Sequence, residues 1–123
     1  MPETVSRHRN AKETLRIVLA RLEDMKAEDS VTIDLIGKSS IADYMVVASG
    51  RSNRHVASIA EQVIKDAGQA HVPRLRSEGL RQGDWVLIDA GDVVVHLFRP
   101  EIRAHYNLEK MWSAGRADAR RAS

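Results

Sequence analysis

The stretch "DWVLIDAGDVVVHLF", residues 84–98, constrains the fold of this chain more than any other feature. Two apolar runs, Trp85–Ile88 and Val93–Phe98, are joined by the acidic connection Asp89–Asp92, which contains Gly91. A glycine in a short connection between two such runs is typical of a β-hairpin. The sequence therefore predicts an antiparallel pair of strands that belongs to a larger sheet.

Three further segments have the pattern of β-strands. In residues 31–37, "VTIDLIG", apolar and polar side chains alternate up to a glycine, as in a half-buried strand. Residues 41–50, "IADYMVVASG", are more continuously apolar, which favours a central place in the sheet. Residues 72–80, "VPRLRSEGL", contain Pro73 and two arginines and suit a short edge strand. Together with the hairpin, these segments predict one sheet of about five strands.

Two longer segments have the period of amphipathic helices. In residues 11–25, apolar side chains recur at steps of three and four. A second helix begins after Ser52, a favourable N-cap residue, and ends near Gly68. Its apolar stripe consists of Val56, Ile59, Ala60, Val63, Ile64 and Ala67. Pro100 suits the first turn of a short helix, "PEIRAHYNLEKMW", which we expect to break near Asn107.

The length and the order of these segments predict a single domain. A chain of 123 residues fits one compact core. We assign residues 11–112 to the domain, residues 1–10 to a flexible N-terminal segment, and residues 113–123 to a disordered tail rich in Arg and Ala. The predicted fold is α/β, a mixed sheet flanked by α-helices, because both kinds of segment must bury their apolar faces against each other.

The composition excludes several kinds of site. The chain has no cysteine, which rules out disulfides, iron–sulfur clusters, thiolate zinc sites and cysteine nucleophiles. Its net charge is only +2, and it has two Trp, two Tyr and one Phe, so we expect little direct nucleic-acid binding. The apolar runs are far shorter than the roughly 20 residues of a membrane helix, and the N-terminus has no signal core. These features favour a cytoplasmic protein without membrane contact.

The segment "VVASGRSNRHVASIAEQV", residues 46–63, runs from a strand through a turn into a helix, as many phosphate-binding sites do. Its turn has one glycine, whereas dinucleotide and P-loop sites need several, and no Walker-type lysine follows. A turn in which Ser52 caps the helix explains the same residues without a ligand. We therefore assign no cofactor to this segment.

Other polar residues also have structural explanations. Asp89 and Asp92 could hold Mg²⁺, but aspartate is common in tight turns that bind no metal. Ser49, His55 and Asp89 could form a hydrolytic triad, yet the nucleophile elbow is missing. The five histidines lack the spacing of two ligands on one helix face. We assign no catalytic residue and no metal site, and interpret His96 as a hydrogen-bonded structural histidine.

Aromatic side chains suggest a surface for another protein. Residues 106–112 combine Tyr, Leu and Trp with Glu and Lys, and Trp85 opens the hairpin. Aromatic residues among charged ones are the usual anchors of protein interfaces. Because tryptophan is often largely buried, Trp85 and Trp112 could instead belong to the core. The pattern alone leaves both interpretations open.

Four ordered blocks, "DYMVVASGRSNRHVASIAEQV", "EG", "GDWVLIDAGDVVVHLF" and "YNLEKMW", resemble the ribosomal silencing factor family, also called Iojap-related. The resemblance extends from about Ala11 to Trp112. It implies a cytoplasmic, non-enzymatic factor that binds the large ribosomal subunit through large-subunit ribosomal protein number fourteen. From there the factor would block joining of the small subunit and repress translation when nutrients are short, as part of a stress response.

The resemblance also implies a fold like that of nucleotidyltransferases. These enzymes need closely spaced metal-binding acids after the turn, and the helix after Ser52 offers only Glu61 and Asp66. The alternative function is nevertheless a nucleotidyltransferase-like or other phosphate-handling enzyme. The partner-binding surface carried over from the family consists of Glu78, Gly79, Trp85, Tyr106, Asn107, Leu108, Glu109, Lys110 and Trp112. If the apolar members of this set are exposed together, the free protein would form a homodimer through part of the surface; they are Trp85, Tyr106, Leu108 and Trp112.

Overall fold

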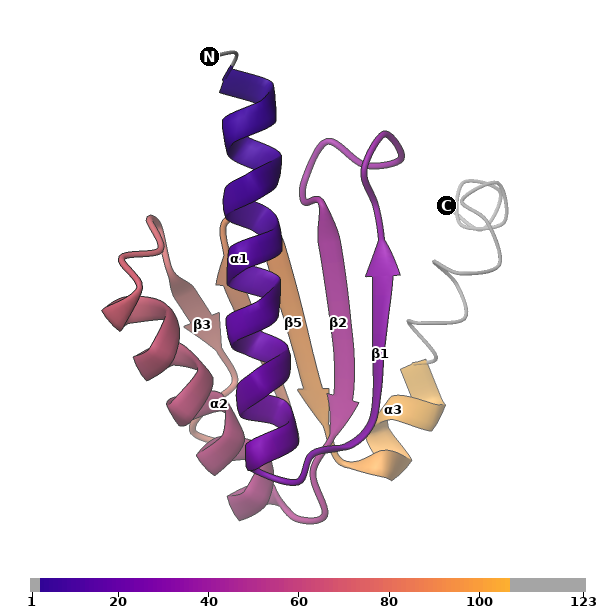
Figure 1. Ribbon diagram of the computed structural model, residues 1–123. Helices are drawn as coiled ribbons and strands as arrows, with labels where there is room; N and C mark the ends of the chain where they lie inside the picture. Colours follow the sequence, from indigo (N-terminus) through magenta and orange to yellow (C-terminus); the bar gives the residue numbers. More distant parts are fainter. Residues whose placement is uncertain (1–2, 107–123) are drawn as a thin grey trace.

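The computed structural model describes residues 3–106 (Figure 1). In chain order the elements are α1 (Glu3–Asp24), β1 (Glu28–Asp34), β2 (Tyr44–Ser49), α2 (Asn53–Gln69), β3 (Arg76–Glu78), β4 (Trp85–Ala90), β5 (Val93–Phe98) and α3 (Pro100–Tyr106). The five strands form one mixed sheet with helices packed against it, which confirms the predicted α/β fold. None of the helices within residues 3–106 is long and apolar enough to cross a membrane.

The strand order of the sheet is β1-β2-β5-β4-β3. Only β2 and β5 pair in parallel, and every other neighbouring pair is antiparallel. The predicted hairpin is confirmed as β4 and β5, joined by Gly91 and Asp92, with Gly91 at a φ of +76°. All residues of β2 are buried between its two neighbours, as its continuous apolar run predicts. The predicted edge strand is confirmed as β3.

Helices α1 and α2 cover the same face of the sheet, in front of the strands in Figure 1. The stripe predicted for α2 points into this core, with Ile64 only partly buried at its margin. From the sheet, alternate residues such as Val46, Val86 and Val95 meet the helices and are fully buried. This helix-covered core is the larger of two hydrophobic clusters and holds the domain together.

Several element boundaries differ from the prediction. Helix α1 begins at Glu3 rather than Ala11, so most of the segment assigned to residues 1–10 is helical. Strand β1 spans Glu28–Asp34 rather than residues 31–37; the prediction missed its start because the first residues are exposed and show no apolar alternation. Helix α2 continues one residue beyond Gly68, and His71, at a φ of +60°, takes the left-handed position after the helix.

Candidate partner-binding face

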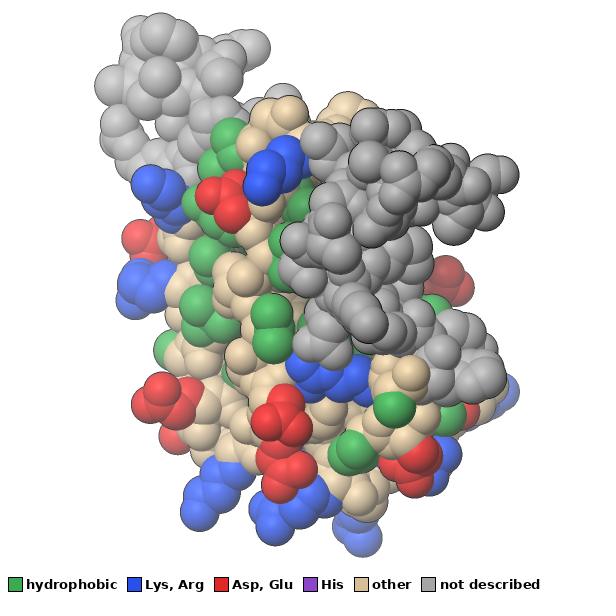
Figure 2. All heavy atoms as spheres, turned by 90° about the vertical axis from the view of Figure 1, so that its right-hand side faces the viewer, with side chains coloured by type: hydrophobic (Ala, Val, Ile, Leu, Met, Phe, Trp, Pro, Cys, Tyr) green, Lys and Arg blue, Asp and Glu red, His purple; other side chains and the backbone are tan. Residues whose placement is uncertain are grey.

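The face of the sheet that is turned away from α1 and α2 has its own apolar cluster, against which α3 packs through Ile102. We call this the α3 face. Because strand side chains alternate between faces, it receives the residues of each strand that the helix-covered core does not. Its cluster consists of Ile33, Leu35, Ala42, Met45, Val47 and Phe98, with Trp85, Val94 and Ile102 packed against it. Figure 2 views the side of β1 and α3 and shows hydrophobic side chains among charged ones of both signs.

Three aromatic rings meet on the α3 face at the paired ends of β4 and β5. Trp85 lies opposite Phe98 in the strand register, and their rings stack with centroids 5.0 Å apart. The indole Nε1–H of Trp85 donates a hydrogen bond to Nδ1 of His96 at 3.1 Å. His96 and Phe98 are stacked at 5.9 Å with an interplanar angle of 13°. Trp85 is therefore half-buried, with one ring face on Phe98 and its polar edge satisfied.

The protonation state of His96 follows from this geometry. Its Nδ1 accepts the indole hydrogen bond, so the neutral imidazole carries its proton on Nε2. Burial lowers the pKa of His96 from its ordinary value of 6.5 to about 4, because a charged imidazole would lose its hydration. The interpretation of His96 as a hydrogen-bonded structural histidine is confirmed, and its partner is Trp85.

The structure brings Glu78, Gly79 and Trp85 together. Glu78 is exposed on the edge strand β3 and pairs with Leu87, two residues after Trp85. Gly79 has a φ of +91°, and a Cβ there would lie 2.1 Å from the carbonyl oxygen of Trp85. Only glycine fits a backbone position this close to the start of β4. Tyr106 ends α3, and the other predicted contacts lie outside the described residues: Asn107, Leu108, Glu109, Lys110 and Trp112.

A groove of about 620 Å³ lies over β3 and β4, and its lining residue Leu87 is two positions after Trp85 on β4. Leu87 gives it an apolar floor, and Arg76, Glu78 and Asp89 stand around it. The Arg76 guanidinium lies 3.6 Å from the Asp89 carboxylate, an exposed contact that contributes little to stability. The candidate site thus combines a half-buried aromatic centre with a charged margin, an arrangement common in protein interfaces.

In the turn between β2 and α2, polar groups form hydrogen bonds with one another. As predicted, Ser52 caps α2, and its hydroxyl accepts a hydrogen bond from the His55 amide at 3.0 Å. Nδ1 of His55 accepts from the Arg51 amide at 2.9 Å. A Cβ on Gly50 would lie 2.9 Å from the Val56 nitrogen, so this glycine allows the helix to pack closely on the turn. Two amides that a phosphate would need are therefore already bonded.

The remaining candidates for chemistry are not assembled into a site. Ser49 accepts a hydrogen bond from the buried Arg103 of α3, whereas Asp89 lies near the opposite end of the sheet. Asp89 instead accepts from the Gly91 amide at 3.1 Å, as expected of an aspartate in a turn. Within residues 3–106, no group of three or more His, Cys, Asp or Glu side chains could hold a metal ion.

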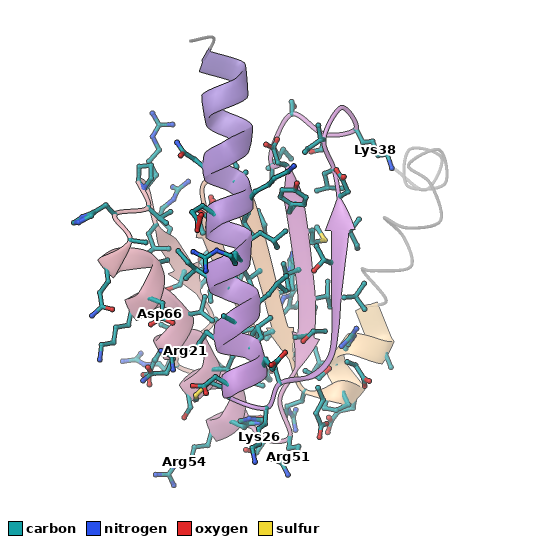
Figure 3. All side chains as sticks on the ribbon, in the orientation of Figure 1. Arg21, Lys26, Lys38, Arg51, Arg54 and Asp66 are labelled. Carbon is teal, nitrogen blue, oxygen red and sulfur yellow. The ribbon has the colours of Figure 1, made fainter. Side chains whose placement is uncertain are left out.

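Glu61 and Asp66, the two acids of α2, do not form a metal-binding pair in the described part of the chain. Asp66 receives two hydrogen bonds from the Arg21 guanidinium, at 2.7 and 3.1 Å, and so links α2 to α1 (Figure 3). This contact raises the pKa of Arg21. Sequence reasoning did not predict the role of Arg21 or of Arg103, because both partners are distant along the chain.

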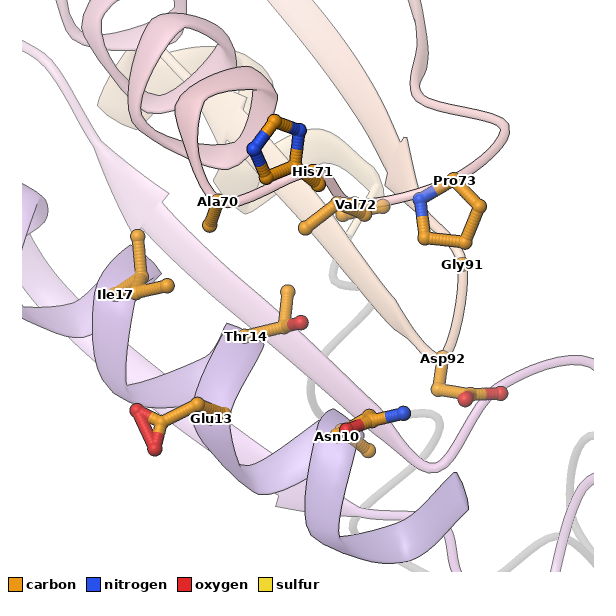
Figure 4. Close-up of a pocket in the computed structure, with 12 residues that line it drawn as sticks. Asn10, Glu13, Thr14, Ile17, Ala70, His71, Val72, Pro73, Gly91 and Asp92 are labelled. Carbon is orange, nitrogen blue, oxygen red and sulfur yellow. The ribbon is translucent and has the colours of Figure 1, made fainter. Parts of the chain in front are cut away.

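A second groove, of about 630 Å³, lies at the other end of the hairpin from Trp85 (Figure 4). It is lined by α1, by the connection after α2 and by the turn at Gly91 and Asp92. Glu13 faces it from α1 but hydrogen-bonds to Arg16. No sequence motif marked this groove, and its polar side chains come from separate elements without a shared spacing.

Comparison with known proteins identifies the relatives of this domain. A sequence profile described as "Ribosomal silencing factor during starvation" matches residues 8–123. A protein of Zymomonas mobilis named ribosomal silencing factor is 52% identical over 103 residues, which cover 82% of this chain and 76% of that protein. A crystal structure of a Chromobacterium violaceum protein superposes with a TM-score of 0.80 at 39% identity, covering 84% and 86% of the two chains.

A more distant relative is the mouse protein named mitochondrial assembly of ribosomal large subunit protein 1. It is 31% identical over 109 residues, which cover 86% of this chain and 48% of the mouse protein. Fold and site define a small α/β domain with one helix-covered core and an aromatic centre on its other sheet face. The chain belongs to the ribosomal silencing factor family, which confirms the resemblance seen in its sequence.

Proposed function

We propose that this protein binds the large ribosomal subunit through large-subunit ribosomal protein number fourteen, with the α3 face as its docking surface. Bound there, it blocks association with the small subunit sterically and represses translation when nutrients are short. The observation that carries this proposal is the half-buried Trp85, held by Phe98 and His96 beside the exposed Glu78. Membership in the ribosomal silencing factor family supports the ribosome as the target.

The α3 face suits a folded protein better than bare RNA. A tryptophan at the centre of a contact can bury a large apolar area, and charged residues at its margin give orientation. The margin here contains both signs, Arg76 with Glu78 and Asp89, and the net charge of the chain is only +2. A phosphate backbone would instead require an excess of positive charge. We therefore propose a protein contact with little direct nucleic-acid binding.

We also propose that the protein acts without catalysis, in the cytoplasm. The turn at residues 49–52 resembles a phosphate site, but the Arg51 and His55 amides have partners within the chain. Asp66, one of two acids on α2 considered for a metal pair, is bonded to Arg21. An enzyme of the nucleotidyltransferase kind needs both of these features free for substrate and metal.

A co-sedimentation experiment tests the proposed function. Purified protein is mixed with bacterial large subunits, small subunits or both, and each mixture is separated on a sucrose gradient. We expect the protein to migrate with large subunits and to prevent the formation of whole ribosomes. Trp85→Ala should lose this binding, whereas Ile41→Ala, which alters a 76% exposed side chain in the β1–β2 connection, should retain it. Equal binding by wild type and folded Trp85→Ala would contradict the proposed surface.

A further inference from the structure

We infer that His96 is a positioning residue, whose imidazole holds the indole of Trp85 in the orientation that docking requires. This inference rests on the proposed function of the α3 face. The two side chains come from different strands and are joined by the 3.1 Å bond from indole Nε1 to Nδ1 of His96. His96 itself need not touch the partner, because its effect passes through Trp85.

Two contacts restrain the Trp85 ring in complementary ways. Stacking on Phe98 fixes the plane of the indole, with centroids 5.0 Å apart and an interplanar angle of 27°. Stacking is weakly directional within that plane, so the ring could still turn or slide on its neighbour. The hydrogen bond to His96 is directional and fixes the polar edge. Together they leave the exposed part of the indole in one orientation.

The acceptor in this pair is itself held firmly. His96 lies on β5, the middle strand of the sheet, between Val47 of β2 and Leu87 of β4. The residue is only 8% exposed, and its ring also stacks on Phe98. Burial keeps the imidazole neutral, which leaves Nδ1 able to accept at physiological pH. A rigid acceptor on a central strand can therefore orient a side chain on the neighbouring strand.

The expected benefit is a lower cost of binding. A tryptophan that is free to rotate loses that freedom when it docks, and a pre-oriented one does not. Removing the acceptor while keeping the apolar volume should therefore weaken docking by roughly 3- to 10-fold. A residue with a purely structural role would change the stability of the fold without changing the orientation of the indole.

The hydrogen bond can be tested directly in the wild-type protein by NMR with ¹⁵N labelling. The indole signal of Trp85 is assigned by its absence from the Trp85→Ala spectrum. We expect a scalar coupling across the hydrogen bond between indole Nε1 and Nδ1 of His96, and histidine shifts of the Nε2–H form. A proton on Nδ1 at pH 7 would overturn the inference. This measurement requires no ribosome and no variant of His96.

Docking is then compared between two substitutions of His96. His96→Leu removes the acceptor, and His96→Asn retains one, because the Oδ1 of Asn and the Nδ1 of His are both two bonds from Cβ. We expect His96→Leu to shift the Trp85 indole signal and to weaken large-subunit binding by roughly 3- to 10-fold, and His96→Asn to bring both back toward the wild type. A folded His96→Leu that binds like the wild type would overturn the inference. If the wild type itself fails to bind subunits, the proposed function fails, and the docking role of His96 fails with it.

Discussion

At the scale of single residues, His96 and Trp85 form a polar contact on an otherwise apolar sheet face. His96 is buried, and its imidazole accepts a hydrogen bond from the half-buried indole of Trp85. Burial alone lowers its pKa to about 4, although Asp89 of the adjacent strand β4 and Glu78 of the next strand β3 lie on the same sheet face. Between pH 6.5 and about 4, His96 is therefore neutral in the native protein and protonated in the unfolded chain.

We predict a loss of stability in acid that is traceable to His96. Between pH 6.5 and about 4 the unfolded chain binds a proton at this residue and the native protein does not. The free energy of unfolding therefore falls as the pH falls through this window, by about 3 kcal/mol at its lower end, and is unaffected above it. Urea unfolding of wild type and His96→Leu between pH 7 and pH 4 measures this difference. Parallel curves for the two proteins would contradict the prediction.

Trp85 should matter more for docking than for folding. If it anchors the interface, Trp85→Ala should weaken large-subunit binding by roughly 2–4 kcal/mol. Its loss should cost less stability than truncation of its fully buried neighbour Phe98, for which Phe98→Ala predicts about 3–5 kcal/mol. Thermal melts of both variants, run beside the binding assay, separate the two effects. A melting loss as large as that of Phe98→Ala, with normal binding, would identify Trp85 as a core residue.

At the scale of elements, the turn between β2 and α2 shows how a helix start can resemble a ligand site. Ser52 has an extended backbone, with φ of −150° and ψ of 167°, and its hydroxyl bonds to the His55 amide. The His55 ring then bonds to the Arg51 amide and to the carbonyl oxygen of Met25, which follows α1. The turn thus connects the start of α2 to the end of α1 and needs no ligand to complete it.

We predict that Ser52→Ala destabilises the protein by about 1 kcal/mol, because the first turn of α2 loses its cap. Ser52→Asn, which retains a capping oxygen, should stay close to the wild type. The free energy of unfolding in urea measures both variants. If nucleotide with Mg²⁺ stabilised the wild type and this effect disappeared in Ser52→Ala, the turn would be a phosphate site after all.

At the scale of the whole molecule, the two faces of the sheet differ in how fully their apolar side chains are covered. The helix-covered face contains the larger core, with α1 and α2 tied together by Arg21 and Asp66. The α3 face has a smaller cluster, with Trp85, Val94 and Ile102 only partly buried at its margin. Partly covered apolar area of this kind favours association with another surface. This is why we propose a homodimer of the free protein through part of its docking face.

We predict that the dimer and the ribosome complex compete. A two-fold contact requires only a self-complementary patch, and a dimer that covers Trp85 lowers the apparent affinity for the subunit by mass action. Analytical ultracentrifugation across a range of concentrations should show dimers that dissociate on dilution. Adding the purified ribosomal protein should then yield a one-to-one complex. An intact dimer bound in a two-to-two assembly would show that the two surfaces are separate.

The local features of this protein are readable from its sequence. Alternating and helical apolar periods predicted the sheet and its helices, Gly91 the hairpin, and Ser52 the start of α2, because each of these depends on neighbours along the chain. The family resemblance likewise selected Trp85 and the pair Glu78-Gly79, which the fold brings together. Boundaries were less accurate where exposure removes the apolar signal, as at the start of β1.

Tertiary structure decided which distant residues meet. The parallel pairing of β2 with β5 sets the order of the sheet, and the register of β4 on β5 places Trp85 opposite Phe98 and within reach of His96. A one-residue shift of that register would turn Trp85 to the helix-covered face. The period of a strand indicates that its side chains alternate, but not which strand lies beside it. The bond between Trp85 and His96 therefore exists only once the sheet has formed.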